Sequence, residues 1–216
     1  MFQILRGDSD MKSTSTKDTL LNVISQENKI FEDTLFALLK ANAQVSDIKL
    51  EDFANGEGIR TSIWLPGCSF YCKGCFNKSS WDYESGRPFT EIDLLNITNR
   101  LIHILNDGVT LLGGEPLMVH NESQYKKYQE RNCATTLAIA KLAKFYDKTV
   151  WVYSGATYEE LSESGSNIVE EALRYIDVLV DGRFEEDKKD LGLKFRGSSN
   201  QRILHIKNGK IDYVEK

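Results

Sequence analysis

Three cysteines in one short loop constrain this sequence more than any other feature. Cys68, Cys72 and Cys75 lie within eight residues, directly after a short apolar segment that ends in Pro66-Gly67. Cubane iron–sulfur clusters are held by cysteine thiolates, and four thiolates ligate all four irons. A loop with three cysteines leaves one iron without a protein ligand, so a small molecule can bind there and receive an electron. The spacing therefore favours a [4Fe–4S] cluster on these three residues.

A zinc site is the main alternative for this loop. Structural zinc takes four closed ligands, and Cys133 or a histidine would have to complete the set. The spacing, however, matches neither a pair of CxxC units nor a bacterial ferredoxin run. Cys133 itself lies near the start of an apolar helical segment, where a cysteine packs as a small hydrophobe. We therefore expect Cys133 in the core, and His103 and His120 at the surface.

The composition is that of a folded chain. Of its 216 residues, 41% are hydrophobic and 27% are charged, which argues against global disorder. The formal net charge is −5 and there is no basic tract, so we expect no nucleic-acid partner, because phosphate binding requires clustered Lys and Arg. Residues 1–10 lack the apolar segment of a signal peptide, and no stretch reaches the ~18 apolar residues of a membrane span. We expect a cytoplasmic protein with no membrane partner, and in that reducing compartment clustered thiols indicate metal binding or catalysis.

From Asp47 onward, apolar strand segments alternate with helical segments. Thr90 with Asp93, and Thr157 with Glu160, form capping-box patterns that predict helix starts. The predicted strands are 62–65, 109–112, 149–153 and 177–180, and the predicted helices are 90–106, 132–146 and a third that begins after 157. Repeated β-then-α units imply parallel strands with right-handed crossovers, so the predicted class is α/β, with the site in the loops after the strand ends.

The two ends of the chain depart from this alternation. Residues 7–18 are polar and lack periodicity, which is typical of a linker or a frayed end. A helical pattern follows, with one apolar face formed by Leu20, Ile24, Phe31, Leu35 and Leu38. We expect this helix to dock on the domain, with a partner-binding arm as the alternative, and we divide the chain into an extension of unknown role (1–46) and a main domain (47–216).

The carboxyl-terminal end carries a hairpin signal. The apolar segments 203–206 and 210–214 flank Asn208-Gly209, a pair that favours a type I′ turn. We therefore expect a β-hairpin at this end.

A second motif agrees with the cysteine loop. The segment from Val109 to Pro116 is a predicted strand followed by Gly113-Gly114-Glu115. Glycines let backbone carbonyls approach a ligand closely, and a carboxylate suits an ammonium group. With the three-cysteine loop, this segment resembles the radical S-adenosylmethionine (SAM) superfamily, in which the strand-plus-GGE segment contacts the amino group of the methionine moiety.

Further blocks narrow the resemblance to one family within that superfamily. From about Asp47 to Lys207, the chain is similar to the activating enzymes of anaerobic (class III) ribonucleotide reductases. The blocks that carry this similarity are Cys75 to Trp81, Ser85 to Thr90, Val150 to Gly155, Val178 to Phe184 and Arg196 to Gln201. The last block, Arg-Gly-Ser-Ser-Asn-Gln, favours this family over radical SAM enzymes in general, and residues 1–46 fall outside the match.

The resemblance implies an oxidoreductase with two cofactors, a [4Fe–4S] cluster and SAM. An electron from the cluster would break the C5′–S bond of SAM, and the resulting 5′-deoxyadenosyl radical would take a hydrogen from a glycine of the reductase subunit. The implied partners are that catalytic subunit and an electron donor such as flavodoxin or ferredoxin. The implied fold is a partial (β/α) barrel of the radical SAM type, with the carboxyl-terminal hairpin and the amino-terminal helical extension.

The resemblance also assigns roles to residues. Cys68, Cys72 and Cys75 would ligate the cluster, and Glu115 would meet the ammonium of SAM. The residues expected to bind the cofactor are Gly74, Cys75, Phe76, Gly113, Gly114, Glu115, Tyr153 and Ser154. The stretch from Arg196 to Gln201 would contact SAM or the partner, or form a polar surface turn.

Two residues depart from the pattern of the family, and two alternatives to the implied function remain. Glu57 stands where such activases usually have proline, so its loop is expected to be looser, and Gly74 replaces the aromatic residue of many radical SAM enzymes. One alternative is an activase of another glycyl-radical enzyme, such as pyruvate formate-lyase. The other is a non-catalytic module that binds zinc or an iron–sulfur cluster.

Overall fold

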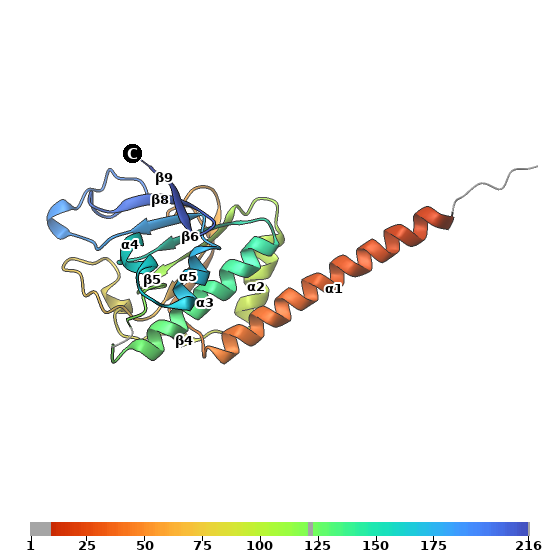
Figure 1. Cartoon of the computed structure of the whole chain (residues 1–216), viewed down its shortest axis with the longest axis horizontal. Helices are drawn as coiled ribbons and strands as arrows, with labels where there is room; N and C mark the ends of the chain where they lie inside the picture. Colours follow the sequence, from red (N-terminus) through yellow and green to blue (C-terminus); the bar gives the residue numbers. More distant parts are fainter. Residues whose placement is uncertain (1–9, 121–122, 216) are drawn as a thin grey trace, which may run out of the picture.

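A mixed seven-stranded sheet organises the computed structural model, which describes residues 10–120 and 123–215 (Figure 1). Within these ranges, seven strands follow the order β2-β3-β5-β6-β7-β8-β9. Their bounds are β2 (Asp47–Asp52), β3 (Arg60–Leu65), β5 (Gly108–Gly113), β6 (Thr149–Tyr153), β7 (Val178–Asp181), β8 (Arg202–Lys207) and β9 (Lys210–Val214). The four parallel strands are β3, β5, β6 and β7, and β2, β8 and β9 pair antiparallel at the two sides. The predicted α/β class is confirmed, and the sheet is open, with β2 and β9 at its edges.

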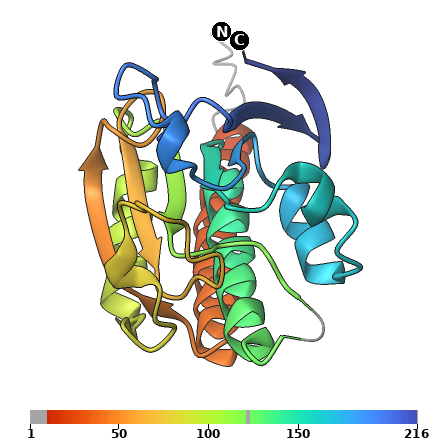
Figure 2. The ribbon, with the colours of Figure 1, turned by 90° about the vertical axis from the view of Figure 1, so that its left-hand side faces the viewer.

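Helices connect the parallel strands. α2 (Glu91–Ile102) lies between β3 and β5, α3 (Lys126–Phe145) between β5 and β6, and α4 (Tyr158–Ser162) with α5 (Asn167–Leu173) between β6 and β7. Because these strands are adjacent in chain order and such crossovers are right-handed, their helices cover the same face of the sheet. α3 packs between α1 (Asp10–Lys40) and α5, and Figure 2 shows α1 and α3 side by side.

Local signals in the sequence set several element boundaries. The capping boxes of Thr90 with Asp93 and of Thr157 with Glu160 are both present, as predicted. The hairpin of β8 and β9 is also confirmed, and Asn208 and Gly209 take the positive φ angles of 52° and 77° that a type I′ turn requires.

Other boundaries differ from the prediction. α2 ends at Ile102 rather than at 106, because His103 takes an extended conformation. α3 begins at Lys126, six residues earlier than predicted, since its polar first turns give no apolar periodicity. The edge strand β2 and the two-stranded pair of β1 (Gln44–Val45) with β4 (Arg87–Pro88) were not predicted, because they are short or polar.

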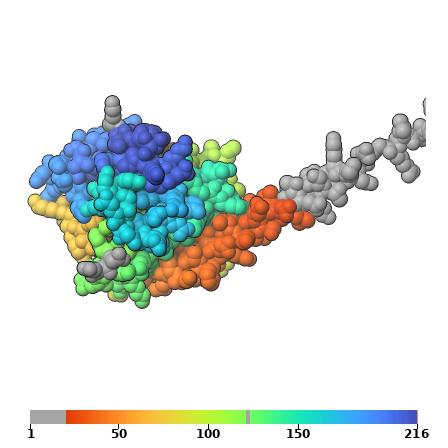
Figure 3. All heavy atoms as spheres, viewed as in Figure 1, coloured from red at the N-terminus to blue at the C-terminus, as the bar shows by residue number. Residues whose placement is uncertain are grey.

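α1 joins the body through its carboxyl-terminal half. Leu38 is buried, and Phe31 and Leu35 pack against the same core as the strands, while Ile24 is exposed. The helix leaves the body toward its amino-terminal end (Figures 1 and 3). Gly7 to Ser9 lie outside the described residues, but 10–18 are helical, so the predicted linker is wrong there. Among the described residues, no helix combines the length and apolar character needed to cross a membrane.

One buried arginine closes the amino-terminal ends of the parallel strands. The Arg60 guanidinium is 1% exposed and lies over the Trp151 ring, 5.4 Å from its centroid. It donates hydrogen bonds to the Val109 carbonyl (2.6 Å), to the carbonyl and hydroxyl of Thr149 (3.0 and 2.9 Å), to the Thr110 hydroxyl (2.7 Å) and to the Glu57 carbonyl (3.2 Å). Arg60 thereby links β3, β5 and β6 at their amino-terminal ends.

Candidate functional site

The opposite ends of these strands open into a cavity of about 760 Å³. All three cysteines of the loop after β3 line it, together with the ends of β5 and β6. The loop that runs from Phe184 to Gln201 forms another wall, and it lies beside the cysteine loop at one end of the molecule (Figures 2 and 3). Chain segments far apart in the sequence therefore meet at this cavity.

Backbone hydrogen bonds hold the cysteine loop in shape. At its base, the amide of Gly67 donates to the Ser80 carbonyl (2.7 Å) and the amide of Cys68 to the Trp81 carbonyl (3.0 Å). Within the loop, the amide of Cys75 donates to the Cys72 carbonyl (3.1 Å). The loop thus presents its three thiols on a closed, braced turn.

The donor set of this loop fits an iron–sulfur cluster. Its three thiols are partly exposed toward one cavity, and the Asn77 amide donates to the Cys75 sulfur (3.4 Å), a contact of the kind that tunes such clusters. Burial, with the nearby charge of Glu115, raises the pKa of the Cys68 thiol to about 12, and burial also raises the pKa of Cys72. Metal binding must therefore displace protons from these thiols.

Cys133 takes no part in the cavity. It is fully buried within α3 as part of the hydrophobic core, and burial raises the pKa of its thiol. The expectation of core packing is confirmed. His103 and His120 are exposed, also as expected. Among the described residues, no three His, Cys, Asp or Glu side chains are grouped as a site for a single metal ion.

Gly113-Gly114 packs directly against the start of the cysteine loop. Gly113 has a φ of 109°, and a Cβ on Gly114 would lie 2.2 Å from the Gly67 carbonyl oxygen. The Gly114 amide donates to the Leu65 carbonyl (2.7 Å), and the Glu115 amide donates to the Gly67 carbonyl (2.8 Å). Only glycine permits this approach, which brings the two motifs to one wall of the cavity.

The Glu115 side chain is turned into the protein rather than toward the cavity. It is 1% exposed and is not among the residues that line the cavity. One carboxylate oxygen accepts hydrogen bonds from the Leu117 and Met118 amides (both 3.0 Å) and from the Ser154 hydroxyl (2.8 Å), and the other accepts from the Gly155 amide (2.8 Å). Burial raises the pKa of Glu115, and these four donors counteract that effect. The carboxylate thus joins the turn after β5 to the end of β6.

The other expected cofactor residues fall into two groups. Tyr153, Ser154 and Phe76 line the cavity, and the buried Tyr153 hydroxyl has no hydrogen-bond partner among the described residues. Gly74 does not line it: with a φ of 75°, it packs against Glu186.

The sequence gave no signal for several lining residues. Lys49, Asn55 and Trp64 come from β2, β3 and the loop between them, where no motif marks them. Arg196 and Gln201 also line the cavity, in the block whose role the sequence left open.

The Arg196 to Gln201 turn is internally braced. Gln201 accepts from the Gly197 and Ser198 amides (2.9 and 3.2 Å) and donates to the Gly182 carbonyl (3.0 Å). The Nε of Arg196 is buried without a partner among the described residues, which leaves a cationic donor at the cavity wall.

Comparison with known proteins agrees with this site. The chain belongs to the class of proteins with a 4Fe-4S single cluster domain, whose family model matches residues 54–204. Within that class, it belongs to the family of the anaerobic ribonucleoside-triphosphate reductase-activating proteins. It is 40% identical to the Pasteurella multocida protein of that name over 159 residues, which cover 72% of this chain and 92% of that protein. The resemblance drawn from the sequence is thereby confirmed.

More distant relatives carry the same name. The Escherichia coli (strain K12) protein is 36% identical over 162 residues, which cover 72% of this chain and 94% of that protein. The protein of Enterobacteria phage T4 is 32% identical over 158 residues, which cover 73% of this chain and 91% of that protein.

Proposed function

We propose that this chain activates an anaerobic ribonucleoside-triphosphate reductase by cleaving SAM reductively and placing a radical on a glycine of the reductase. A [4Fe–4S] cluster would supply the electron that breaks the C5′–S bond, which yields methionine and a 5′-deoxyadenosyl radical able to take a hydrogen atom from glycine. Cys68, Cys72 and Cys75 would hold the cluster. The chain would work in the cytoplasm, with a small redox protein such as flavodoxin or ferredoxin as its electron source.

One observation carries this proposal: a single cavity joins the three thiols to the Gly113-Gly114 turn. The volume in front of the thiols, about 760 Å³, lies within the range of pockets for small molecules and cofactors. Such a cavity, beside an iron that lacks a fourth thiolate, supports the binding of a small molecule at that iron. A closed zinc site would need a fourth ligand, and Cys133 lies in the core instead.

The chain's own residues would then orient the molecule. The backbone of Gly113-Gly114 would face the ammonium group of SAM. The Glu115 carboxylate, buried behind the wall of the cavity, would attract that ammonium electrostatically. The unpaired Tyr153 hydroxyl and the Arg196 guanidinium suit the ribose and the carboxylate, since each can donate a hydrogen bond. Phe76, which packs edge-on against Phe184 at 5.5 Å between ring centroids, would exclude water from one side.

The arrangement of the sheet supports a partial (β/α) barrel of the radical SAM type. The four parallel strands run in chain order with crossovers of one hand, which is the way that a barrel grows. The site at the carboxyl ends of these strands agrees with this class of fold.

The test is to form the glycyl radical under anaerobic conditions. The protein is reconstituted with iron and sulfide and mixed with SAM, dithionite and the catalytic subunit of the reductase, and the glycyl doublet is followed by electron paramagnetic resonance. We expect about four irons per chain, 5′-deoxyadenosine as product and a glycyl signal. Pyruvate formate-lyase in place of the reductase tests the alternative target. Zinc at one per chain, with no iron and no 5′-deoxyadenosine, would exclude the enzyme and leave a binding module.

A further inference from the structure

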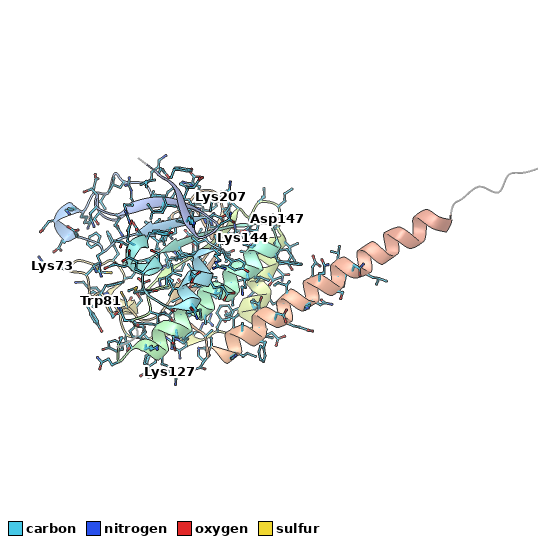
Figure 4. All side chains as sticks on the ribbon, in the orientation of Figure 1. Lys73, Trp81, Lys127, Lys144, Asp147 and Lys207 are labelled. Atoms are coloured by element: carbon cyan, nitrogen blue, oxygen red, sulfur yellow. The ribbon has the colours of Figure 1, made fainter. Side chains whose placement is uncertain are left out.

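The amino-terminal half of α3 carries a buried polar face, although such side chains are mostly exposed in proteins. Five of its polar side chains are at most 6% exposed: Gln129, Arg131, Asn132, Thr135 and Thr136. In Figure 4, Lys127 in the first turn of α3 lies on the side of Trp81, and Lys144 in the last turn lies away from it. Buried polar groups need hydrogen-bond partners, so the bonds of this face show which part of the molecule it holds.

Asn132 donates both hydrogens of its side-chain amide to the two motifs of the site. Its Nδ2 atom donates to the Pro66 carbonyl (2.8 Å) and to the Glu115 carbonyl (3.1 Å), which lie 66 and 17 residues away in the chain. The Oδ1 atom faces the Nε of Arg131 at 3.4 Å. The amide has one favourable orientation, because turning it over would place its oxygen against two carbonyl oxygens.

The bond to Pro66 completes a set of three. The carbonyls of residues 65–67 lead from β3 to Cys68, and each accepts a hydrogen bond. The first accepts from the Gly114 amide (2.7 Å) and the third from the Glu115 amide (2.8 Å). The middle carbonyl accepts from Asn132, which also holds the carbonyl of Glu115. Asn132 thus joins the start of the cysteine loop, the glycine turn and α3 at one point.

Neighbouring side chains on α3 bond to one motif each. Gln129 donates to the Ser69 hydroxyl (3.3 Å) in the cysteine loop, and Thr136 donates to the Pro116 carbonyl (3.1 Å) after the glycine turn. Among the described side chains of this polar face, Asn132 is therefore the one that bonds to both motifs. Asn132 is 1% exposed and does not line the cavity, so any effect on a bound molecule must act through the segments that it holds.

We propose that Asn132 is a positioning residue, which fixes the cysteine loop and the Gly113-Gly114 turn at the spacing that SAM needs. This inference rests on the proposed function, in which SAM reaches from the open iron to that turn. Cys68 and both glycines line the cavity, and Asn132 holds the residues that adjoin them. A molecule that binds two groups at once needs them at a fixed distance, and a displacement of about 1 Å can cost on the order of 100-fold in rate.

The experiment compares two variants of the reconstituted full chain, each with one buried polar side chain of α3 replaced by an apolar one of similar size. Asn132→Leu removes the donor to both motifs, whereas Thr136→Val removes a donor to the turn alone. If the leucine variant does not fold, Asn132→Ser takes its place, since a hydroxyl donates only one hydrogen bond. Urea midpoints show how much stability each variant has lost.

Hydrogen exchange followed by mass spectrometry, without SAM, measures how firmly the two segments are held. We expect the Gly114 and Glu115 amides to exchange about tenfold faster in Asn132→Leu than in Thr136→Val, because the junction that closes over them is lost. The Thr149 amide, which donates to the Asp107 carbonyl at the closed end of the sheet, is the internal reference and should exchange at equal rates.

SAM affinity, measured by equilibrium dialysis, is the second readout. It should fall about tenfold in Asn132→Leu and stay within about twofold of the wild-type value in Thr136→Val, with the iron content unchanged in both. Equal affinities in the two variants would overturn the proposal, because Asn132 would then support the fold alone, and so would equal exchange rates. A wild-type chain with four irons that neither binds nor cleaves SAM would instead contradict the proposed function, and the exchange rates would still decide whether Asn132 holds the two segments together.

Discussion

The two ends of the parallel strands contrast sharply in how they satisfy their polar groups. At the amino-terminal end, one buried guanidinium, that of Arg60, donates five hydrogen bonds to three chain segments and packs on Trp151. At the carboxyl-terminal end, the Tyr153 hydroxyl and the Arg196 Nε are buried beside a cavity, and neither has a hydrogen-bond partner within 10–120 and 123–215. Unpaired buried polar groups cost free energy, so a ligand in the cavity that paired with these two groups would offset that cost.

The amino-terminal end of the parallel strands therefore serves stability, and the carboxyl-terminal end carries the candidate site. The closed end holds the strands in register through side-chain contacts that span 49 and 89 residues of sequence. At the open end, the glycine turn and the three cysteines line one cavity. Variants at the two ends should therefore change different measured quantities.

The largest effect is expected at the open end, from Cys72→Ser. A hydroxyl does not replace the thiolate as an iron ligand, so 5′-deoxyadenosine formation should fall to background. The free energy of unfolding of the metal-free protein should change by less than about 0.5 kcal/mol, because the side chain is partly exposed. Product is measured by chromatography and stability by urea unfolding. Turnover retained by Cys72→Ser would contradict the ligand assignment.

Truncation tests how far the body extends toward α1. Removing residues 1–46 deletes the buried side chains of Leu38 and Val45, and by the cost of large-to-small core changes we expect a loss of about 4 kcal/mol or more. Removing residues 1–20 should change stability by less than about 0.5 kcal/mol.

SAM cleavage by the two truncated proteins then tests the division after residue 46. The proposed two-unit organisation predicts that both cleave SAM when kept cold enough to stay folded. If only the shorter truncation does, the second half of α1 belongs to the functional domain.

At the closed end, Arg60→Met should destabilise the fold. The substitution preserves much of the volume but leaves the Val109 and Thr149 carbonyls without their donor, at an expected cost of about 3–5 kcal/mol. The matched control is Arg87→Met, since Arg87 is exposed and pairs with Asp93 at the surface, where the loss should be below about 1 kcal/mol. Urea unfolding of both variants provides the measurement. Equal losses would mean that Arg60 does not brace the strands.

Tyr153→Phe should lower the affinity for SAM and leave stability intact, whereas Arg60→Met should lower stability. The Tyr153 hydroxyl has no hydrogen-bond partner in the described part of the chain, so stability should stay constant or rise by up to about 1 kcal/mol. Affinity for SAM should fall about tenfold if the hydroxyl donates to it, as measured by equilibrium dialysis on the reconstituted protein. Unchanged affinity together with lost stability would show that Tyr153 supports the fold and does not bind SAM.

The smallest effect on the cofactor site is expected from Cys133→Ser. A buried hydroxyl replaces a thiol that packs as a hydrophobe, so we expect a loss of about 1–2 kcal/mol in the free energy of unfolding. Iron content after reconstitution should stay at the wild-type level, as determined by elemental analysis. Loss of iron at unchanged stability would reveal a ligand role.

Much of this molecule could be predicted because the signals are local. The capping residues Thr90 and Thr157 bond to groups three residues away, and Asn208-Gly209 sets its turn through its own backbone angles. The spacing of the cysteines likewise lies within one loop. In each case the interacting residues are close in the chain, so one short stretch of sequence contains both of them.

The sequence by itself determined the α/β class, the helix caps, the hairpin and the set of three clustered thiols. Only the tertiary structure decided that Glu115 turns inward to Ser154 and Gly155, 39 and 40 residues away, rather than toward the cavity. It also decided that Trp81 lines both this cavity and a second hollow, of about 520 Å³. The physical reason is the same for both: a side chain's direction depends on which distant segments pack beside it, and spacing along the chain does not contain that information.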